Sequence, residues 1–191
     1  MKNIGILIFD DVEILDFAGP YEVFSVTGKR EGKGYFNVFT VSEKEVVKTA
    51  NGLKVIPDYN LTNHPNIEIL VVPGGLGART EIKNEVVLKW VRDVSKVSEY
   101  ILSVCTGSLI LAKAGLLEKL EATTHYTCYD LLQELDTTLK LKKERFVDNG
   151  KIITSAGVSA GIDASMYIIE KIHGRDVSEE TAKHIEYPYY K

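Results

Sequence analysis

The 191-residue sequence contains only two cysteines, Cys105 and Cys128, and a single tryptophan. Two cysteines outside any CxxC pair cannot build a disulfide framework, so we expect the protein in a reducing cytoplasm. The sequence also has no HxxxH or HExxH pattern, and a zinc site is therefore not expected.

The sequence has no excess of basic residues and no long apolar run. Its 23 Lys and Arg residues are outnumbered by 27 Asp and Glu residues, which gives a net charge of −4 and argues against a nucleic-acid or anionic-membrane partner. Apolar runs stay well short of the roughly 20 residues that span a membrane, and the first residues, MKNIGILIFDD, lack a signal-peptide cleavage region. We expect a small-molecule partner, and neither nucleic acid nor membrane.

What is present is the composition of one ordinary globular domain over residues 1–191, with 45% hydrophobic and 26% charged residues. Continuous apolar runs at 3–9, 67–72 and 100–104 predict strands that are buried on both faces. Amphipathic segments at 81–94 and 159–173 predict helices.

Further elements complete an alternation of strands and helices. An early helix is predicted with Pro20 in its first turn, and Gly115 predicts a left-handed helix cap. Segment 46–56, with Asn51-Gly52 at its centre, predicts a hairpin with a type I′ turn, and 139–154 predicts a second hairpin. The alternation predicts an α/β fold with a parallel sheet covered on both faces, in which ligands bind at the carboxyl ends of the strands.

The strongest local signal is the change from strand to helix at Cys105. Small residues at Ser103 and Gly107 flank it two positions away, as in a nucleophile elbow, where the turn leaves no room for bulk. N–H groups of the following helix would face the thiol and favour its thiolate. The alternative interpretation is a small buried hydrophobic residue at a strand end.

A second segment at the same sheet edge is the loop Gly74-Gly75-Leu76-Gly77. Thr80 stands where a dinucleotide fingerprint needs its third glycine, so a nicotinamide site is not indicated. The amides of Gly75 and Thr106 together would suit an oxyanion hole, and Leu76 would line the substrate pocket. A tight turn without catalytic function explains the glycines equally well.

Asp16 has two interpretations, a first-turn helix acid or a carboxyl group beside the thiol. Asp10, Asp11 and Glu13 compete for the second role, and their spacing does not choose among them.

His125 is the histidine best placed to pair with Cys105, because it follows a predicted strand. A structural role, or a role in supporting the catalytic residues without contacting the substrate, fits equally well. Cys128 has no elbow around it and is interpreted as structural.

Together these segments resemble the ThiJ/PfpI superfamily, which is related to class I glutamine amidotransferases. The resemblance runs through the stretches ILIFDDVEILDFAGPYEVF, ILVVPGGLGA, SVCTGSLILAKAGLLE, ATTHY and SAGVSAGID. It implies a flavodoxin-like three-layer sandwich, no cofactor, and a homodimer with sites near the interface.

The branch that the sequence resembles is isocyanide hydratase. In that branch the nucleophile matches Cys105, the next residue matches Thr106, and the catalytic carboxylate matches Asp16. Proteases and glyoxalases of the superfamily commonly carry histidine after the cysteine and glutamate at the carboxylate position, and this sequence departs from both.

The resemblance extends to the N-terminal halves of DNA-binding regulators, which continue into a helix-turn-helix region. This sequence ends at YPYYK, so we do not expect that role. Three hypotheses follow: an isocyanide hydratase-like lyase, a small-substrate amidase or hydrolase, and a redox sensor based on Cys105.

Overall fold

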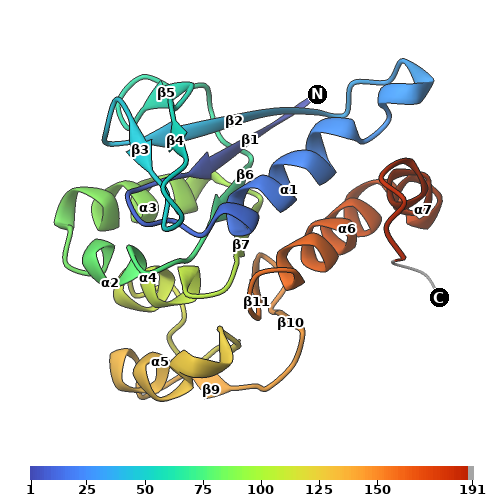
Figure 1. Cartoon of the computed structure of the whole chain (residues 1–191). Helices are drawn as coiled ribbons and strands as arrows, with labels where there is room; N and C mark the ends of the chain where they lie inside the picture. Colours follow the sequence, from blue (N-terminus) through green and yellow to red (C-terminus); the bar gives the residue numbers. More distant parts are fainter. Residues whose placement is uncertain (189–191) are drawn as a thin grey trace.

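A seven-stranded, mainly parallel sheet forms the centre of the computed structural model, which describes residues 1–188 (Figure 1). The strand order is β10-β11-β7-β6-β1-β2-β5, and every neighbouring pair is parallel except β10 and β11. The strands are β1 (Lys2–Leu7), β2 (Phe36–Ser42), β5 (Tyr59–Asn60), β6 (Ile69–Val72), β7 (Tyr100–Ser103), β10 (Phe146–Asp148) and β11 (Ile152–Ser155). The predicted parallel sheet is confirmed, and the last residues of the predicted domain, 189–191, lie outside the described part.

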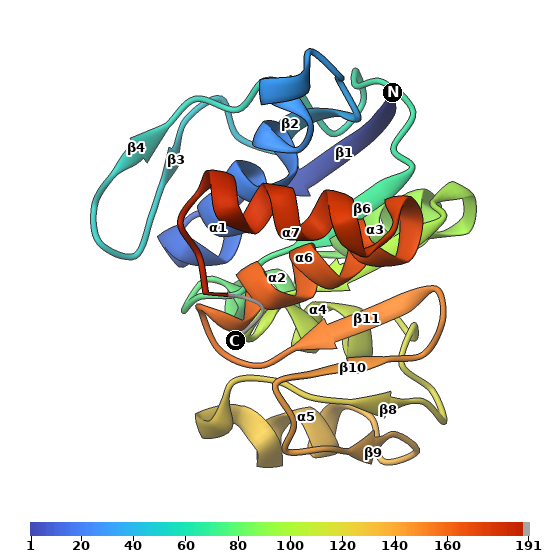
Figure 2. The same ribbon diagram turned by 90° about the vertical axis from the view of Figure 1, so that its right-hand side faces the viewer.

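Helices cover both faces of this sheet and complete a three-layer α/β sandwich (Figures 1 and 2). One layer contains α1 (Ile14–Val26), α6 (Ala160–His173) and α7 (Arg175–His184). The other contains α2 (Ala78–Glu81), α3 (Glu85–Val97) and α4 (Gly107–Lys113), with α5 (Tyr129–Leu135) packed on α4. The remaining elements are β3 (Val47–Lys48), β4 (Lys54–Val55), β8 (Glu121–Ala122), β9 (Lys140–Leu141), and the 3₁₀ turns η1 (Lys29–Glu31) and η2 (Tyr126–Cys128).

The core is formed where the central strands meet both helix layers. The side chains of Ile4, Ile6, Leu70, Ile101 and Leu102 are almost fully buried. Because helices lie on both faces, successive residues of these strands are apolar, which explains the continuous apolar runs of the sequence. Over residues 1–188, no helix combines the length and the apolar character that crossing a membrane requires.

Two helix predictions were wrong at their N-terminal ends. Helix α1 begins at Ile14, so Pro20 lies inside it, where the ring leaves the carbonyl of Asp16 without its usual N–H donor. The helix predicted from position 81 is two helices, because Asn84 accepts the N–H groups of Val86 and Val87 and thereby caps a new one, α3.

The first hairpin is confirmed, but its turn type is not. Gly52 has a positive φ of 87° and Asn51 does not, whereas a type I′ turn needs both. The Thr49 N–H bonds to the Leu53 carbonyl and the Gly52 N–H to the Thr49 carbonyl, so the loop is a three-residue turn that ends in a left-handed glycine. In the second predicted hairpin, β10 pairs with β11, whereas β9 pairs in parallel with β8.

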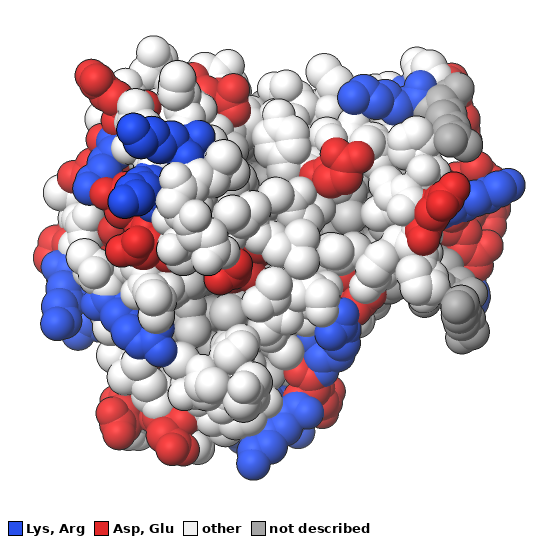
Figure 3. All heavy atoms as spheres, in the orientation of Figure 1, with Lys and Arg blue, Asp and Glu red and all other residues white. Residues whose placement is uncertain are grey.

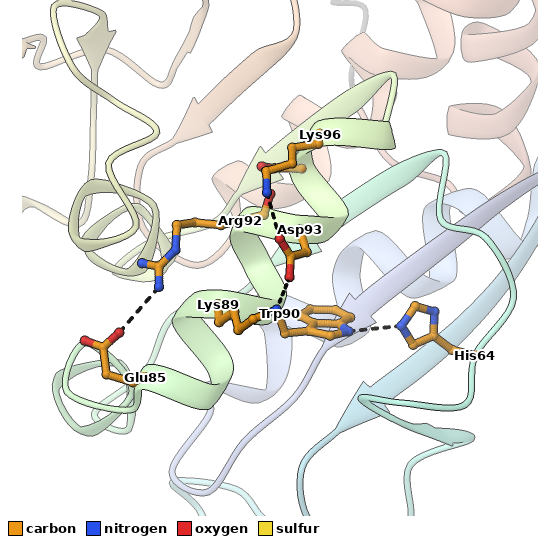
Figure 4. Close-up of polar contacts among 8 residues, drawn as sticks. His64, Glu85, Lys89, Trp90, Arg92, Asp93 and Lys96 are labelled. Carbon is orange, nitrogen blue, oxygen red and sulfur yellow. Dashed lines mark hydrogen bonds and ion pairs between the residues drawn. The ribbon is translucent and has the colours of Figure 1, made fainter.

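Charged side chains of both signs are interspersed on the face of the molecule shown in Figure 3. On α3 they form an exposed set that we call the α3 ion-pair face, which consists of Glu85, Lys89, Arg92, Asp93 and Lys96 (Figure 4). Beside it the Trp90 indole N–H donates to His64 Nε2 at 3.0 Å, which ties α3 to the loop before β6.

Candidate active site

The site begins with the sharp turn that carries Cys105 between β7 and α4. Cys105 has a φ of 56°, a conformation that is uncommon for a residue with a side chain. Its N–H donates to the carbonyls of Ser155 and Ala156 at 3.2 and 3.1 Å, and its own carbonyl accepts the Thr124 hydroxyl at 3.0 Å. These bonds hold the backbone in its strained form.

The predicted need for small residues around the elbow has a direct cause. A Cβ atom on Gly107 would lie 2.0 Å from the Val72 carbonyl oxygen, so the chain can leave β7 at this angle only with glycine there. Ser103 on the other side is fully buried. The elbow prediction is therefore confirmed at the level of the backbone.

Asp16 brings a carboxyl group from α1 to this turn. Its side chain is fully buried beside the Cys105 thiol, and its Oδ2 accepts the Gly74 N–H at 3.0 Å. Its Oδ1 is buried and has no hydrogen-bond partner among the described residues. A Cβ atom on Gly74 would lie 2.4 Å from the Thr106 nitrogen and 2.9 Å from Asp16 Oδ2, so glycine is what allows this close approach.

Of the three competing acids, Asp10 and Asp11 lie elsewhere, and Glu13 lies near Asp16. Asp10 pairs with Lys44 at 2.5 Å and accepts the Lys48 N–H at 2.9 Å, whereas Asp11 is exposed. Glu13 precedes α1, where its N–H donates to the Gly74 carbonyl at 2.9 Å. The structure thus identifies Asp16 as the acid that lies beside the Cys105 thiol, a choice that the sequence spacing could not make.

Burial decides the protonation of both groups. Desolvation raises the pKa of Asp16 from 3.8 to about 7, against the opposing effects of the Gly74 N–H and the nearby Cys105 thiol. Desolvation and the nearby Asp16 carboxylate raise the pKa of Cys105 to about 12, although the N–H groups of Thr106 and Val158 act in the opposite direction. The Thr106 N–H at the helix start thus favours the thiolate as expected, but burial and Asp16 outweigh it.

Thr106 and Gly75 bind each other. The Gly75 N–H donates to Thr106 Oγ1 at 2.9 Å, and the same hydroxyl donates to the Gly75 carbonyl at 3.0 Å. The Gly75 amide, expected in an oxyanion hole, is thus engaged by the threonine hydroxyl in this structure. The pair fixes the glycine loop to the turn that follows Cys105.

Val158 is a site residue that sequence reasoning did not identify in this role. Its backbone N–H acts on the thiol by lowering the pKa of Cys105, and its φ of 46° is a pronounced outlier for a β-branched side chain. A signal existed in the surrounding small residues of the stretch SAGVSAG, but no sequence rule places a positive φ on valine.

The other predicted residues surround this centre at greater distance. His125 Nδ1 bonds to the Thr127 hydroxyl at 2.8 Å, and its ring packs against Gly157, where a Cβ would meet it at 2.3 Å. Among the described hydrogen bonds none joins His125 to Cys105 or Asp16. Leu76 is 68% exposed and therefore lies at the surface rather than in an enclosed pocket.

Cys128 is buried and accepts a hydrogen bond from the Arg79 guanidinium at 3.0 Å, which joins η2 to α2. Over residues 1–188, no group of three or more His, Cys, Asp and Glu side chains is arranged to hold a metal ion.

The comparisons with known proteins agree with this geometry. The model of the DJ-1/PfpI family matches residues 2–171. The chain is 34% identical to isonitrile hydratase of Pseudomonas putida over 186 residues, which are 97% of the chain and 78% of that enzyme. It is 27% identical to the HTH-type transcriptional regulator GbdR of Pseudomonas aeruginosa, covering 93% of the chain but only 48% of the regulator.

Among solved structures, a ThiJ/PfpI family protein from Pseudomonas syringae matches with a TM-score of 0.90 and 27% identity. The match covers 100% of this chain and 76% of that one. The sandwich, the elbow and the sequence stretches thus point to one family.

Proposed function

The chain belongs to the DJ-1/PfpI family, and we propose that it is a cysteine enzyme that hydrates an isocyanide to an N-substituted formamide without a cofactor. One observation carries the proposal, the position of the buried Asp16 carboxyl group beside the Cys105 thiol, where each group shifts the pKa of the other. An acid with a pKa of about 7 both accepts and releases a proton near neutral pH, which is what a shared acid-base residue requires. The 34% identity to an isonitrile hydratase supports this choice of substrate.

In the first step the Cys105 sulfur attacks the terminal carbon of the isocyanide and forms a carbon–sulfur bond. The Asp16 carboxylate takes the thiol proton and delivers it to the same carbon, which gives a thioimidate, Cys–S–CH=N–R. A protonated thiol suits this step, because the proton that the carbon needs is already in the site. The N–H groups of Thr106 and Val158 stabilise negative charge on the sulfur.

In the second step water adds across the C=N bond. Asp16 removes one proton from the water as the oxygen bonds to carbon and passes that proton to the nitrogen, which gives Cys–S–CH(OH)–NH–R. Collapse of this adduct breaks the carbon–sulfur bond, returns a proton to sulfur and releases R–NH–CHO. The sum is one isocyanide plus one water to one formamide.

Thr106 and the Gly75 amide act on this chemistry by fixing the loop from which the Gly74 N–H reaches Asp16. Leu76, exposed on the same loop, would contact the substituent of the substrate. His125 would act only indirectly, by supporting the segment that carries Val158.

The test is formamide production from a simple alkyl or aryl isocyanide. We expect Cys105→Ala and Asp16→Asn each to lose activity by at least about 10²-fold, because each removes a group that handles the proton or the carbon. Matched controls are Cys128→Ser and Asp11→Asn, the latter at a positive φ of 58° that asparagine tolerates. Both should retain activity.

A wild-type protein that makes no formamide would overturn the hydratase. Ammonia or amine release from an amide would then indicate the hydrolase, and rapid, reversible oxidation of Cys105 the redox sensor.

We also propose that the protein acts on a small molecule as a cytoplasmic homodimer and binds no nucleic acid. Size-exclusion chromatography coupled to light scattering measures the molar mass and thereby tests the dimer. Titration with fluorescently labelled DNA tests whether the protein binds nucleic acid.

A further inference from the structure

The segment 156–159, between β11 and α6, holds Val158 in its outlying conformation, with a φ of 46° that a β-branched residue rarely adopts. Such a conformation persists only where neighbouring contacts over-determine it. On one side the His125 ring packs on Gly157 so closely that no Cβ fits. On the other side the Cys105 N–H donates to the Ala156 carbonyl, and Arg145 bonds to both ends of the segment.

Arg145 lies directly before β10 and touches this segment at both ends. Its carbonyl accepts the Ala156 N–H at 2.9 Å, which extends the β10–β11 ladder by one pair. Its guanidinium donates to Ser159 Oγ at 3.2 Å and, through Nε, to Asp163 in the first turn of α6. The Tyr187 hydroxyl donates to the other Asp163 oxygen at 2.9 Å.

We propose that Arg145 is a positioning residue, whose guanidinium holds the segment 156–159 so that the Val158 N–H points at the Cys105 sulfur. The guanidinium suits this task because its planar, forked donors fix two acceptors at once, Ser159 on the segment and Asp163 on the helix behind it. A lysine has one flexible ammonium group and would keep Asp163 while releasing Ser159. The proposal rests on Cys105 being the reactive thiol of the proposed function.

The experiment measures alkylation of Cys105 by iodoacetamide as a function of pH, read by peptide mass spectrometry so that Cys128 is counted separately. The titratable groups that face the thiol region are Asp16 from α1, with Glu13 near it, and His125 beside Gly157. All three are unchanged in the variants Arg145→Gln, Arg145→Lys and Asp163→Asn.

Loss of the Val158 N–H from the sulfur removes a donor to the thiolate, so the pH profile of alkylation should move upward in Arg145→Gln. We expect a shift of about one unit, which means about tenfold slower alkylation at a fixed pH below the midpoint. Arg145→Lys should lie between the wild type and Arg145→Gln. Asp163→Asn should resemble Arg145→Gln, since the guanidinium loses its anchor.

A purely structural role would lower thermal stability without moving the pH profile. Glu179→Gln, which breaks the comparable Arg175–Glu179 ion pair on α7, is the matched control and should leave the profile unchanged. Hydrogen exchange of the Val158 amide, followed by NMR, gives a second readout that does not depend on alkylation, and its protection should fall in Arg145→Gln.

The proposal would be overturned if the alkylation rates of Cys105 in all three variants stay within about twofold of wild type at each pH and the Val158 amide stays protected from exchange. Neither readout uses an isocyanide. Absence of formamide production together with a shifted profile would therefore overturn the proposed function alone.

Discussion

Two carboxyl groups in this protein have opposite surroundings. Asp16 is buried beside a thiol, with one oxygen that has no partner among the described residues, and its pKa is raised to about 7. Asp93, on the α3 ion-pair face, is exposed between Lys89 and Lys96, whose hydrogen bonds lower its pKa to about 2 (Figure 4). Burial of Asp16 costs stability and brings its pKa near neutral pH, whereas the two lysines beside Asp93 satisfy its charge.

Backbone geometry separates the same two regions. Cys105 and Val158 have positive φ values of 56° and 46°, and Gly74 and Gly107 are hemmed in by neighbouring backbone atoms. Helix α3 is regular and capped by Asn84. Strain concentrated where the thiol lies is the expected pattern of a functional site held in place by its fold.

The largest expected effect is a gain of stability in Asp16→Asn. The Asp16 carboxyl ionises near pH 3.8 in the unfolded chain and near 7 in the folded protein, so the folded wild type holds a proton that the unfolded chain has lost. Wild-type stability therefore falls as the pH rises from about 4 to 7. About three pKa units at 1.36 kcal/mol each give an upper limit of about 4 kcal/mol.

Urea unfolding of the wild type and Asp16→Asn at pH 4 and pH 8 measures this difference. The free energy of unfolding of the variant should rise, relative to that of the wild type, from pH 4 to pH 8. If the difference in free energy of unfolding between the wild type and Asp16→Asn is the same at pH 4 and pH 8, then Asp16 does not carry the buried proton.

A somewhat smaller effect, a loss of about 2–3 kcal/mol, is expected for Gly74→Ala. The new Cβ would meet the backbone nitrogen of Thr106, which cannot move without disturbing the elbow. Gly34→Ala is the matched control, since its Cβ would meet only the flexible Met1 side chain at 3.3 Å. Equal losses in thermal melts of both variants would contradict the crowding argument.

The sequence predicted much of this edge because its constraints are local. The apolar run before Cys105 and the small residues around it reflect contacts within a few positions, and the elbow was confirmed. The pairing of Asp16 with Cys105 depends on Gly74, 58 positions from Asp16 along the chain, and spacing left it among four acids. The resemblance to a family, rather than any pattern, selected it.

Non-local contacts also explain what was missed. Val158 takes its positive φ from a segment packed between His125 and Arg145, which no periodicity encodes. The start of α1 was wrong because Pro20 is typical of a first helical turn, yet tertiary packing lets the helix run through it.

Trp90→Phe tests the border between α3 and the loop before β6. The substitution keeps an aromatic ring but removes the indole N–H, and it leaves the half-buried His64 Nε2 without its donor. We expect a loss of about 1 kcal/mol in the free energy of unfolding, measured by urea titration. Val86→Ala, at an exposed position of the same helix, should change it less.

The smallest effect is expected for Asp93→Asn, the same substitution as Asp16→Asn in the opposite surroundings. The pKa of Asp93 is lowered, so its stabilising contribution is present above pH 4 and is lost as the pH falls toward 2, with the sign reversed from Asp16. Because the site is exposed, 0.5 M salt should screen what little remains. Thermal melts of wild type and variant should nearly coincide at pH 7 and converge further at pH 2. A stabilised Asp93→Asn at pH 7 would mean that burial does not separate the two carboxyl groups, since both substitutions would then act alike.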